Sequence, residues 1–152
     1  MNDGIFVIAA FVAGFVIAQG AKFIGALIKK KGKMTLDEVM YWMTRSGGMP
    51  SGHSASFIGA TTIIGFIRGF TSVECAIALC MSIIIIYDAV NVRYAVGEQG
   101  KLLNEIARSD GNAKTKPQKL VEGHTIPQVI VGSIIGIVVG AVVYTIYQTI
   151  MS

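Results

Sequence analysis

Charged residues are scarce in this chain: Asp, Glu, Lys and Arg together make up 14% of its 152 residues, against about 25% in a typical soluble domain. Cysteine is also scarce, and two cysteines are too few for a disulfide scaffold. Apolar residues make up 53% of the chain, which excludes an intrinsically disordered protein, because such a protein lacks the apolar side chains that a core requires. This composition is typical of a small integral membrane protein.

Four apolar segments predict membrane-spanning helices, at residues 4–28, 54–67, 73–92 and 127–150. As a helix the first segment is about 37 Å long, enough to cross a hydrocarbon core of about 30 Å. The second is short, so a re-entrant segment is the alternative to a full crossing. We expect an all-α fold: an integral membrane helical bundle of about four transmembrane helices, forming one domain over residues 1–152.

The basic residues indicate how the bundle lies in the membrane. With four crossings, every Lys and Arg except Arg68 lies on the side of the two long connections. The positive-inside rule places that side in the cytoplasm. We therefore expect a multi-pass protein of the plasma membrane with both termini outside. No basic run is interleaved with aromatic residues, so the net charge of +4 does not indicate binding to nucleic acid.

Two further patterns concern local structure and packing. Thr35 and Glu38 form a capping box, which predicts a short amphipathic helix at the membrane interface. A second short helix is expected at residues 96–108, followed by a polar loop at 110–119. Glycines at 132, 136 and 140 leave one face of the last span bare, so another helix can approach closely there. That approach could occur within the chain or across a homodimer.

The most informative stretch is residues 46–54, which read Ser-Gly-Gly-Met-Pro-Ser-Gly-His-Ser. Glycine-rich turns expose backbone N–H groups, and this turn leads directly into an apolar helix. Unpaired N–H groups and a partial positive charge at a helix N-terminus suit a phosphate. His53 can exchange a proton near neutral pH, and Arg45 can supply a forked cationic contact.

Other polar groups are expected at the same depth. His124, the second of two histidines, also stands just before an apolar helix on the predicted cytoplasmic side. Lys22, Asp88 and Arg93 lie near the cytoplasmic ends of the first and third spans. Because ionisable groups at a membrane boundary are costly and usually functional, we expect these residues to form one site with His53.

Pro50-Ser51-Gly52-His53 resembles the central signature of the type 2 phosphatidic acid phosphatase superfamily, which includes acid phosphatases and haloperoxidases. Residues 47–54 together with 123–125 are similar to its small, divergent membrane branch. The resemblance implies that Ser51 and Gly52 bind phosphoryl oxygens and that His53 protonates the leaving alcohol. It also implies that His124 is the nucleophile.

The resemblance implies a lipid phosphatase that forms a phosphohistidine and needs no metal or other cofactor. The cations at Lys22, Arg45 and Arg93 would neutralise the phosphoryl oxygens. In the superfamily an aspartate four residues after the nucleophile orients it, and here that position is Gln128. Asp88 or Glu122 is therefore expected to orient a histidine. Phosphatidate, phosphatidylglycerophosphate and polyprenyl phosphates are all suitable substrates.

Three other functions are compatible with the sequence. The chain could bind or transport a phospholipid or carrier lipid in the same phosphate pocket without turnover. The two histidines with Asp88 and Glu122 could hold a divalent metal ion, although nearby lysines and arginines would repel it. A purely structural membrane protein is the last alternative, and it gives no reason for the glycine-rich turn before His53.

Overall fold

A computed structural model of the chain describes residues 3–44, 47–109 and 123–152. These residues are helical outside short turns, and no strand occurs among them, so the all-α prediction is confirmed. The elements in chain order are α1 (Asp3–Lys29), α2 (Leu36–Thr44), α3 (Gly52–Arg68), α4 (Val73–Tyr87), the π-helical turn η1 (Asp88–Val92), α5 (Arg93–Ser109) and α6 (Ile126–Met151).

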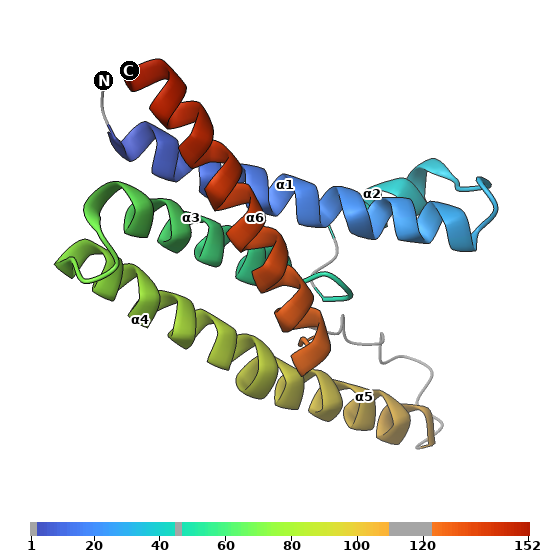
Figure 1. The fold of residues 1–152 in the computed structure, drawn as a ribbon. Coiled ribbons are helices and arrows are strands. Elements are labelled where there is room, and N and C mark those ends of the chain that lie inside the picture. The colour runs from blue at the N-terminus through green and yellow to red at the C-terminus, as the bar shows by residue number, and fades with distance from the viewer. Residues whose placement is uncertain (1–2, 45–46, 110–122) are drawn as a thin grey trace.

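Three helical stretches in the described parts of the chain are long and apolar enough to cross a membrane: Asp3–Lys29, Val73–Ser109 and Ile126–Met151. Helix α3 has 17 residues and is therefore about 26 Å long, slightly less than the hydrocarbon thickness of about 30 Å. It is the short helix of the four that the sequence predicts. It lies among the others, in contact with α1, α4 and α6 (Figure 1).

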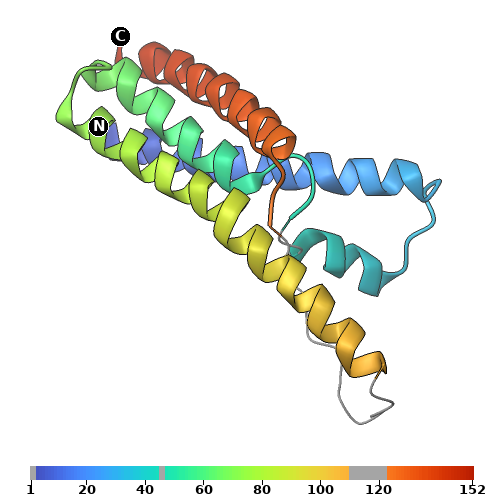
Figure 2. The same cartoon turned by 90° about the horizontal axis from the view of Figure 1, so that it is seen from below.

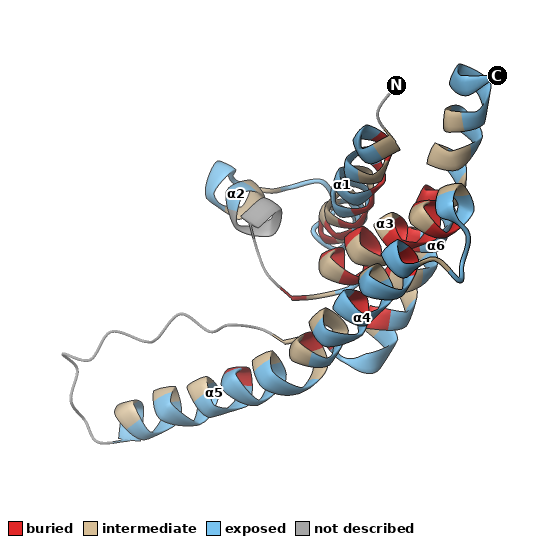
Figure 3. Ribbon diagram, turned by 90° about the vertical axis from the view of Figure 1, so that its left-hand side faces the viewer, coloured by how far each residue is buried: buried red, intermediate tan, exposed pale blue. Residues whose placement is uncertain are grey.

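Helix α3 can form the centre of the bundle because most of its buried side chains are small. Its buried positions include Ser54, Ala55, Ser56 and Gly59, and Figure 3 shows buried residues concentrated on α3 and on the helix faces that surround it. Small residues let neighbouring backbones approach closely, which is how helices associate in a membrane. Larger apolar side chains on α1, α4 and α6 point outward, as expected for helices that contact lipid.

The glycine stripe of α6 packs within the chain, against α3. A Cβ atom added at Gly136 would lie 2.6 Å from the carbonyl oxygen of Ala55, and one at Gly132 would overlap the carbonyl oxygen of Ser51. Gly140 meets the next turn of α3 in the same way. The stripe is therefore already covered within the chain, and a homodimer, which stays a prediction, would use another face.

The third span and the helix after it are continuous, which differs from the two separate helices expected from the sequence. Helix α4 passes through η1 directly into α5, and the backbone N–H of Arg93 donates to the carbonyl oxygen of Asp88, five residues earlier. A π-helical turn holds one more residue than an α-helical turn. The helix therefore widens at Asp88–Val92 and continues through Arg93 without ending.

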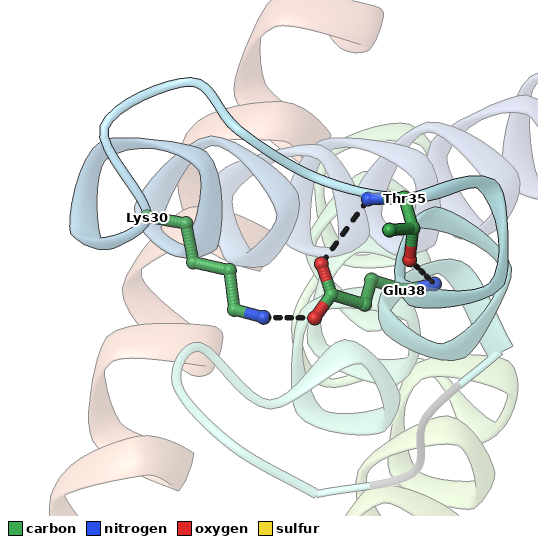
Figure 4. A network of polar contacts seen from close by, with 3 residues as sticks. All are labelled: Lys30, Thr35 and Glu38. Carbon is green, nitrogen blue, oxygen red and sulfur yellow. Dashed lines mark hydrogen bonds and ion pairs between the residues drawn. The ribbon is translucent and has the colours of Figure 1, made fainter.

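The capping box is confirmed at the start of α2. The N–H of Thr35 donates to Glu38 Oε2 at 3.2 Å, and the N–H of Glu38 donates to Thr35 Oγ1 at 3.4 Å. Lys30 forms an ion pair with the same carboxylate (Figure 4), and this hydrogen bond is the main reason why the pKa of Glu38 lies below its ordinary value. The ion pair joins α2 to the end of α1, and α2 packs against α1.

The two ends of the bundle differ. The start of α1, the end of α6 and the turn between α3 and α4 lie at one end, whereas α2, α5 and the segment that enters α6 lie toward the other (Figures 1 and 2). The N-terminus of α3 lies well inside the length of α1. Groups before α3 therefore sit between the ends of the longer helices.

Candidate active site

The turn before α3 depends on two consecutive glycines. Gly47 and Gly48 have φ values of +100° and +77°, which residues other than glycine rarely adopt. The Met49–Pro50 peptide bond that follows is cis. Ser51 then acts as the N-cap of α3, and its Oγ accepts a hydrogen bond from the N–H of Ser54 at 3.3 Å. The glycine-rich sequence thus delivers the chain into a well-capped helix.

Ser51 is held below the surface of this turn. Its side chain is fully buried. Its hydroxyl oxygen accepts a hydrogen bond from the hydroxyl of Ser54 at 3.0 Å, and its backbone N–H donates to the carbonyl oxygen of Gln128 at 3.0 Å. A helix leaves its first N–H groups without an acceptor in the helix, and here these belong to Gly52 and His53. These two N–H groups lack an acceptor within the helix, whereas the Ser51 hydroxyl is already hydrogen-bonded to Ser54.

His124 is fixed by the start of α6. Its Nδ1 lies 3.1 Å from Oε1 of Gln128, and the same oxygen accepts from the N–H of Thr125 at 3.2 Å as part of a capping box. Because this N–H requires an oxygen partner, Oε1 faces the imidazole and Nδ1 must be the donor. In the neutral ring, Nε2 then carries the lone pair. The N–H of His124 also donates to the carbonyl oxygen of Ala89 at 2.9 Å.

The surroundings of His124 favour its neutral form. The residue is 3% exposed, and burial, the largest effect, lowers the pKa of its imidazole below the ordinary value. The hydrogen bond to Gln128 opposes this change and the backbone of Gly48 opposes it more weakly, while the charges of Lys22 and His53 add to it. An imidazole that stays neutral near pH 7 keeps a lone pair on one ring nitrogen, which attack on phosphorus requires.

Lys22 reaches the site from α1. The buried residues of this helix recur every four positions, from Phe6 to Lys22 and on to Ala26. Gly14, one of these residues, meets the backbone of α3 at Ala55. About two turns after Gly14, the buried face of α1 extends beyond the first residue of α3. Lys22 lies there, is only 6% exposed, and is within electrostatic range of both His53 and His124.

Asp88 and Arg93 complete the group from the wide turn η1. Asp88 Oδ2 lies 2.5 Å from Arg93 Nε, and both side chains are within electrostatic range of His53. The segment before α6 packs here as well, because a Cβ atom at Gly123 would overlap the backbone of Tyr94.

Lys22, Asp88 and Arg93 thus lie within electrostatic range of His53, and Lys22 and His53 within range of His124. That these residues form one catalytic site stays a prediction. Arg45 and Glu122 lie outside the described residues. Within the described ranges, no three His, Cys, Asp or Glu side chains gather in a way that could hold a metal ion.

Sequence reasoning missed the part that Gln128 plays. The sequence suggested a carboxylate, Asp88 or Glu122, as the partner of a histidine. The observed partner of His124 is the amide of Gln128, while Asp88 is paired with Arg93. The signal was present in the sequence, because a Thr-x-x-Gln capping box places the glutamine side chain at the helix start, four residues after His124.

Comparison with known proteins agrees with this description. Residues 2–139 match the family described as the Divergent PAP2 family. The chain is 34% identical over 64 residues to the uncharacterized membrane protein YuiD of Bacillus subtilis (strain 168), a stretch that covers 42% of this chain and 40% of that protein. No solved structure matches the chain. From the extent of the first match, this membrane protein belongs to the Divergent PAP2 family.

Proposed function

We propose that this protein hydrolyses a lipid phosphate through a phosphohistidine intermediate and without a metal ion. The observation that carries the proposal is the meeting of both histidines of the chain with Lys22 and Arg93 at the N-terminus of α3. Two imidazoles, fixed cations and free helix N–H groups are the components that phosphoryl transfer requires.

In the first step, Nε2 of His124 attacks phosphorus. The bond between phosphorus and the leaving oxygen breaks, and protonated His53 donates its proton to that oxygen, which leaves as an alcohol. Lys22, Arg93 and the N–H groups of Gly52 and His53 stabilise the charge on the phosphoryl oxygens. Gln128 holds Nδ1–H of His124, so that the attacking nitrogen stays directed at the site.

In the second step, neutral His53 removes a proton from water, and the water oxygen attacks the phosphohistidine. The bond between phosphorus and Nε2 breaks, and inorganic phosphate leaves with His124 again neutral. His53 thus serves first as acid and then as base, and the reaction ends with every proton accounted for.

The substrate we propose is amphiphilic, because the site lies between membrane helices. Phosphatidate, phosphatidylglycerophosphate and polyprenyl phosphates share a phosphate head group with a hydrocarbon tail. The distribution of basic residues favours a site near the cytoplasmic face of the plasma membrane.

A second candidate function is binding or transport of a phospholipid or carrier lipid without turnover. The observation that favours it is the partner of His124, because the neutral amide of Gln128 compensates less of the positive charge on an attacking imidazole than a carboxylate does. Such a protein would hold the phosphate and release it unchanged.

Phosphate release separates the two functions. The purified protein in detergent is given phosphatidate, phosphatidylglycerophosphate and a polyprenyl phosphate, beside His53→Ala and His124→Ala. We expect release by the parent and a loss of at least about a hundredfold in each variant. A chelator should change nothing. Full activity in His124→Ala would contradict the assignment of His124 as the nucleophile. Binding of these lipids without release of phosphate would support the carrier function.

A further inference from the structure

An apolar groove runs along α1 and ends beside the N-terminus of α3. Its volume is about 370 Å³, and its lining residues among those described all belong to α1: Phe15, Val16, Gln19, Gly20 and Phe23. This volume lies within the range of small-molecule pockets. From Phe15 to Phe23 the groove follows about 12 Å of the helix axis.

One end of the groove lies beside the first residue of α3. A Cβ atom at Gly52 would lie 3.3 Å from the ring of Phe15 and 3.9 Å from Oε1 of Gln19. Gly52 is the first residue of α3, and its N–H is one of the groups proposed to bind phosphate. A phosphate at that N-terminus therefore lies next to one end of the groove.

Helix α1 presents two different stripes at this depth. The stripe through Ala18 and Lys22 is buried and directs the lysine toward the two histidines. The stripe through Phe15, Gln19 and Phe23 lies beside it on the helix surface and forms the groove. Helix α1 thus presents a cation that can bind a phosphate head group and, beside it, an apolar surface that can contact the hydrocarbon attached to that head group.

We propose that this groove holds the first part of the hydrocarbon chain of the lipid phosphate, next to the phosphate. This inference rests on the proposed function and adds that the hydrocarbon next to the phosphate runs along α1. Gly20 forms the open part of the groove, because a Cβ atom there meets nothing within 4 Å. In a bilayer the groove positions the chain and gains little affinity from it, since surrounding lipid is equally apolar.

The test fills the groove. Gly20→Leu places a side chain in it, whereas Gly25→Leu, also on α1 with nothing within 4 Å of its Cβ position, leaves the groove open. Both remove a helical glycine, which favours the helix. With the protein in nanodiscs, we expect Gly20→Leu to lower kcat/KM for hexadecyl phosphate about tenfold or more, as overpacking does. Phenyl phosphate hydrolysis should not change, and Gly25→Leu should match the parent with both substrates.

A second measurement does not depend on turnover. Hexadecyl phosphate with a diazirine near its head group is photolysed with the parent protein, and the labelled residues are identified by mass spectrometry. We expect labelling at residues 15–23 that excess hexadecyl phosphate prevents and hexadecanol does not. Labelling spread evenly over α1 and α4, or equal kinetics of the two leucine variants, overturns the groove. If excess hexadecyl phosphate prevents labelling of the groove but no substrate releases phosphate, the proposed phosphatase activity is wrong and the proposed binding of the chain in the groove still holds.

Discussion

Gln128 stands where the wider superfamily carries an aspartate, and its neutral amide is hydrogen-bonded to His124. The capping box indicates where this side chain lies but not which of its atoms faces the histidine, because an amide can turn either its oxygen or its nitrogen toward a neighbour. The N–H of Thr125 settles the choice by requiring the oxygen. By contrast, the position of His53 at the start of α3 could be predicted from sequence, because the glycine-rich turn before it is a local pattern.

Gln128→Glu should make activity more sensitive to acid. Attack requires neutral His124, whose pKa is lowered by burial, so the parent should keep its activity until the pH falls below the ordinary histidine range. A carboxylate at position 128 stabilises the imidazolium and raises this pKa. The acid limb of kcat/KM should therefore move to higher pH. The exposed Gln99→Glu is the control, and an equal shift in that variant would contradict the assignment.

Two buried serines should respond in opposite directions to alanine. The hydroxyl of Ser56 is buried and has no hydrogen-bond partner among the described residues, so Ser56→Ala should raise the free energy of unfolding, by about 1 kcal/mol. Ser82 Oγ lies 2.9 Å from Thr61 Oγ1 on α3, so Ser82→Ala should lower it by about 0.6 kcal/mol. Thermal unfolding in detergent measures both. Destabilisation by Ser56→Ala would indicate that its hydroxyl is satisfied.

At the scale of the helices, apolar length and capping predicted most of the fold. The helices at residues 4–28 and 127–150 were predicted to within about one residue at each end, since long apolar runs leave little choice. The continuity of α4 with α5 was not predicted. Arg93 and its polar neighbours suggested a break, and the ion pair of Arg93 with Asp88 within the wide turn is a contact that hydropathy does not express.

The close approach of α6 to α3 predicts a large effect from one methyl group. Gly136→Ala would set a Cβ atom 2.6 Å from the carbonyl oxygen of Ala55, so the two helices must separate. We expect a loss of about 1–3 kcal/mol in the free energy of unfolding. Gly25→Ala, which has open space, should gain up to about 1 kcal/mol from helix propensity. Thermal unfolding of both variants provides the measurement, and equal stabilities would mean that the helices are not in contact at Gly136.

At the scale of the whole molecule, the distribution of charge predicts an orientation. In a background with Cys75→Ala and Cys80→Ala, single cysteines replace the exposed residues Lys33 and Thr71. Lys33 lies in the turn between α1 and α2 and Thr71 in the turn between α3 and α4, and these turns lie at opposite ends of the bundle. A membrane-impermeant maleimide on intact cells should label position 71 and not position 33, until the membrane is opened. The reverse pattern would place the candidate active site near the outer face.

The wide turn η1 decides which side chains of the third span face one another. Each residue of an α-helix advances the chain by about 100° around the axis, so two residues five apart in a regular α-helix lie about 140° apart. The π-helical turn holds one more residue, which aligns Arg93 with Asp88 on one side of the helix, where the two side chains pair. The same residues wound as a regular α-helix would turn the guanidinium away from the carboxylate and break this ion pair.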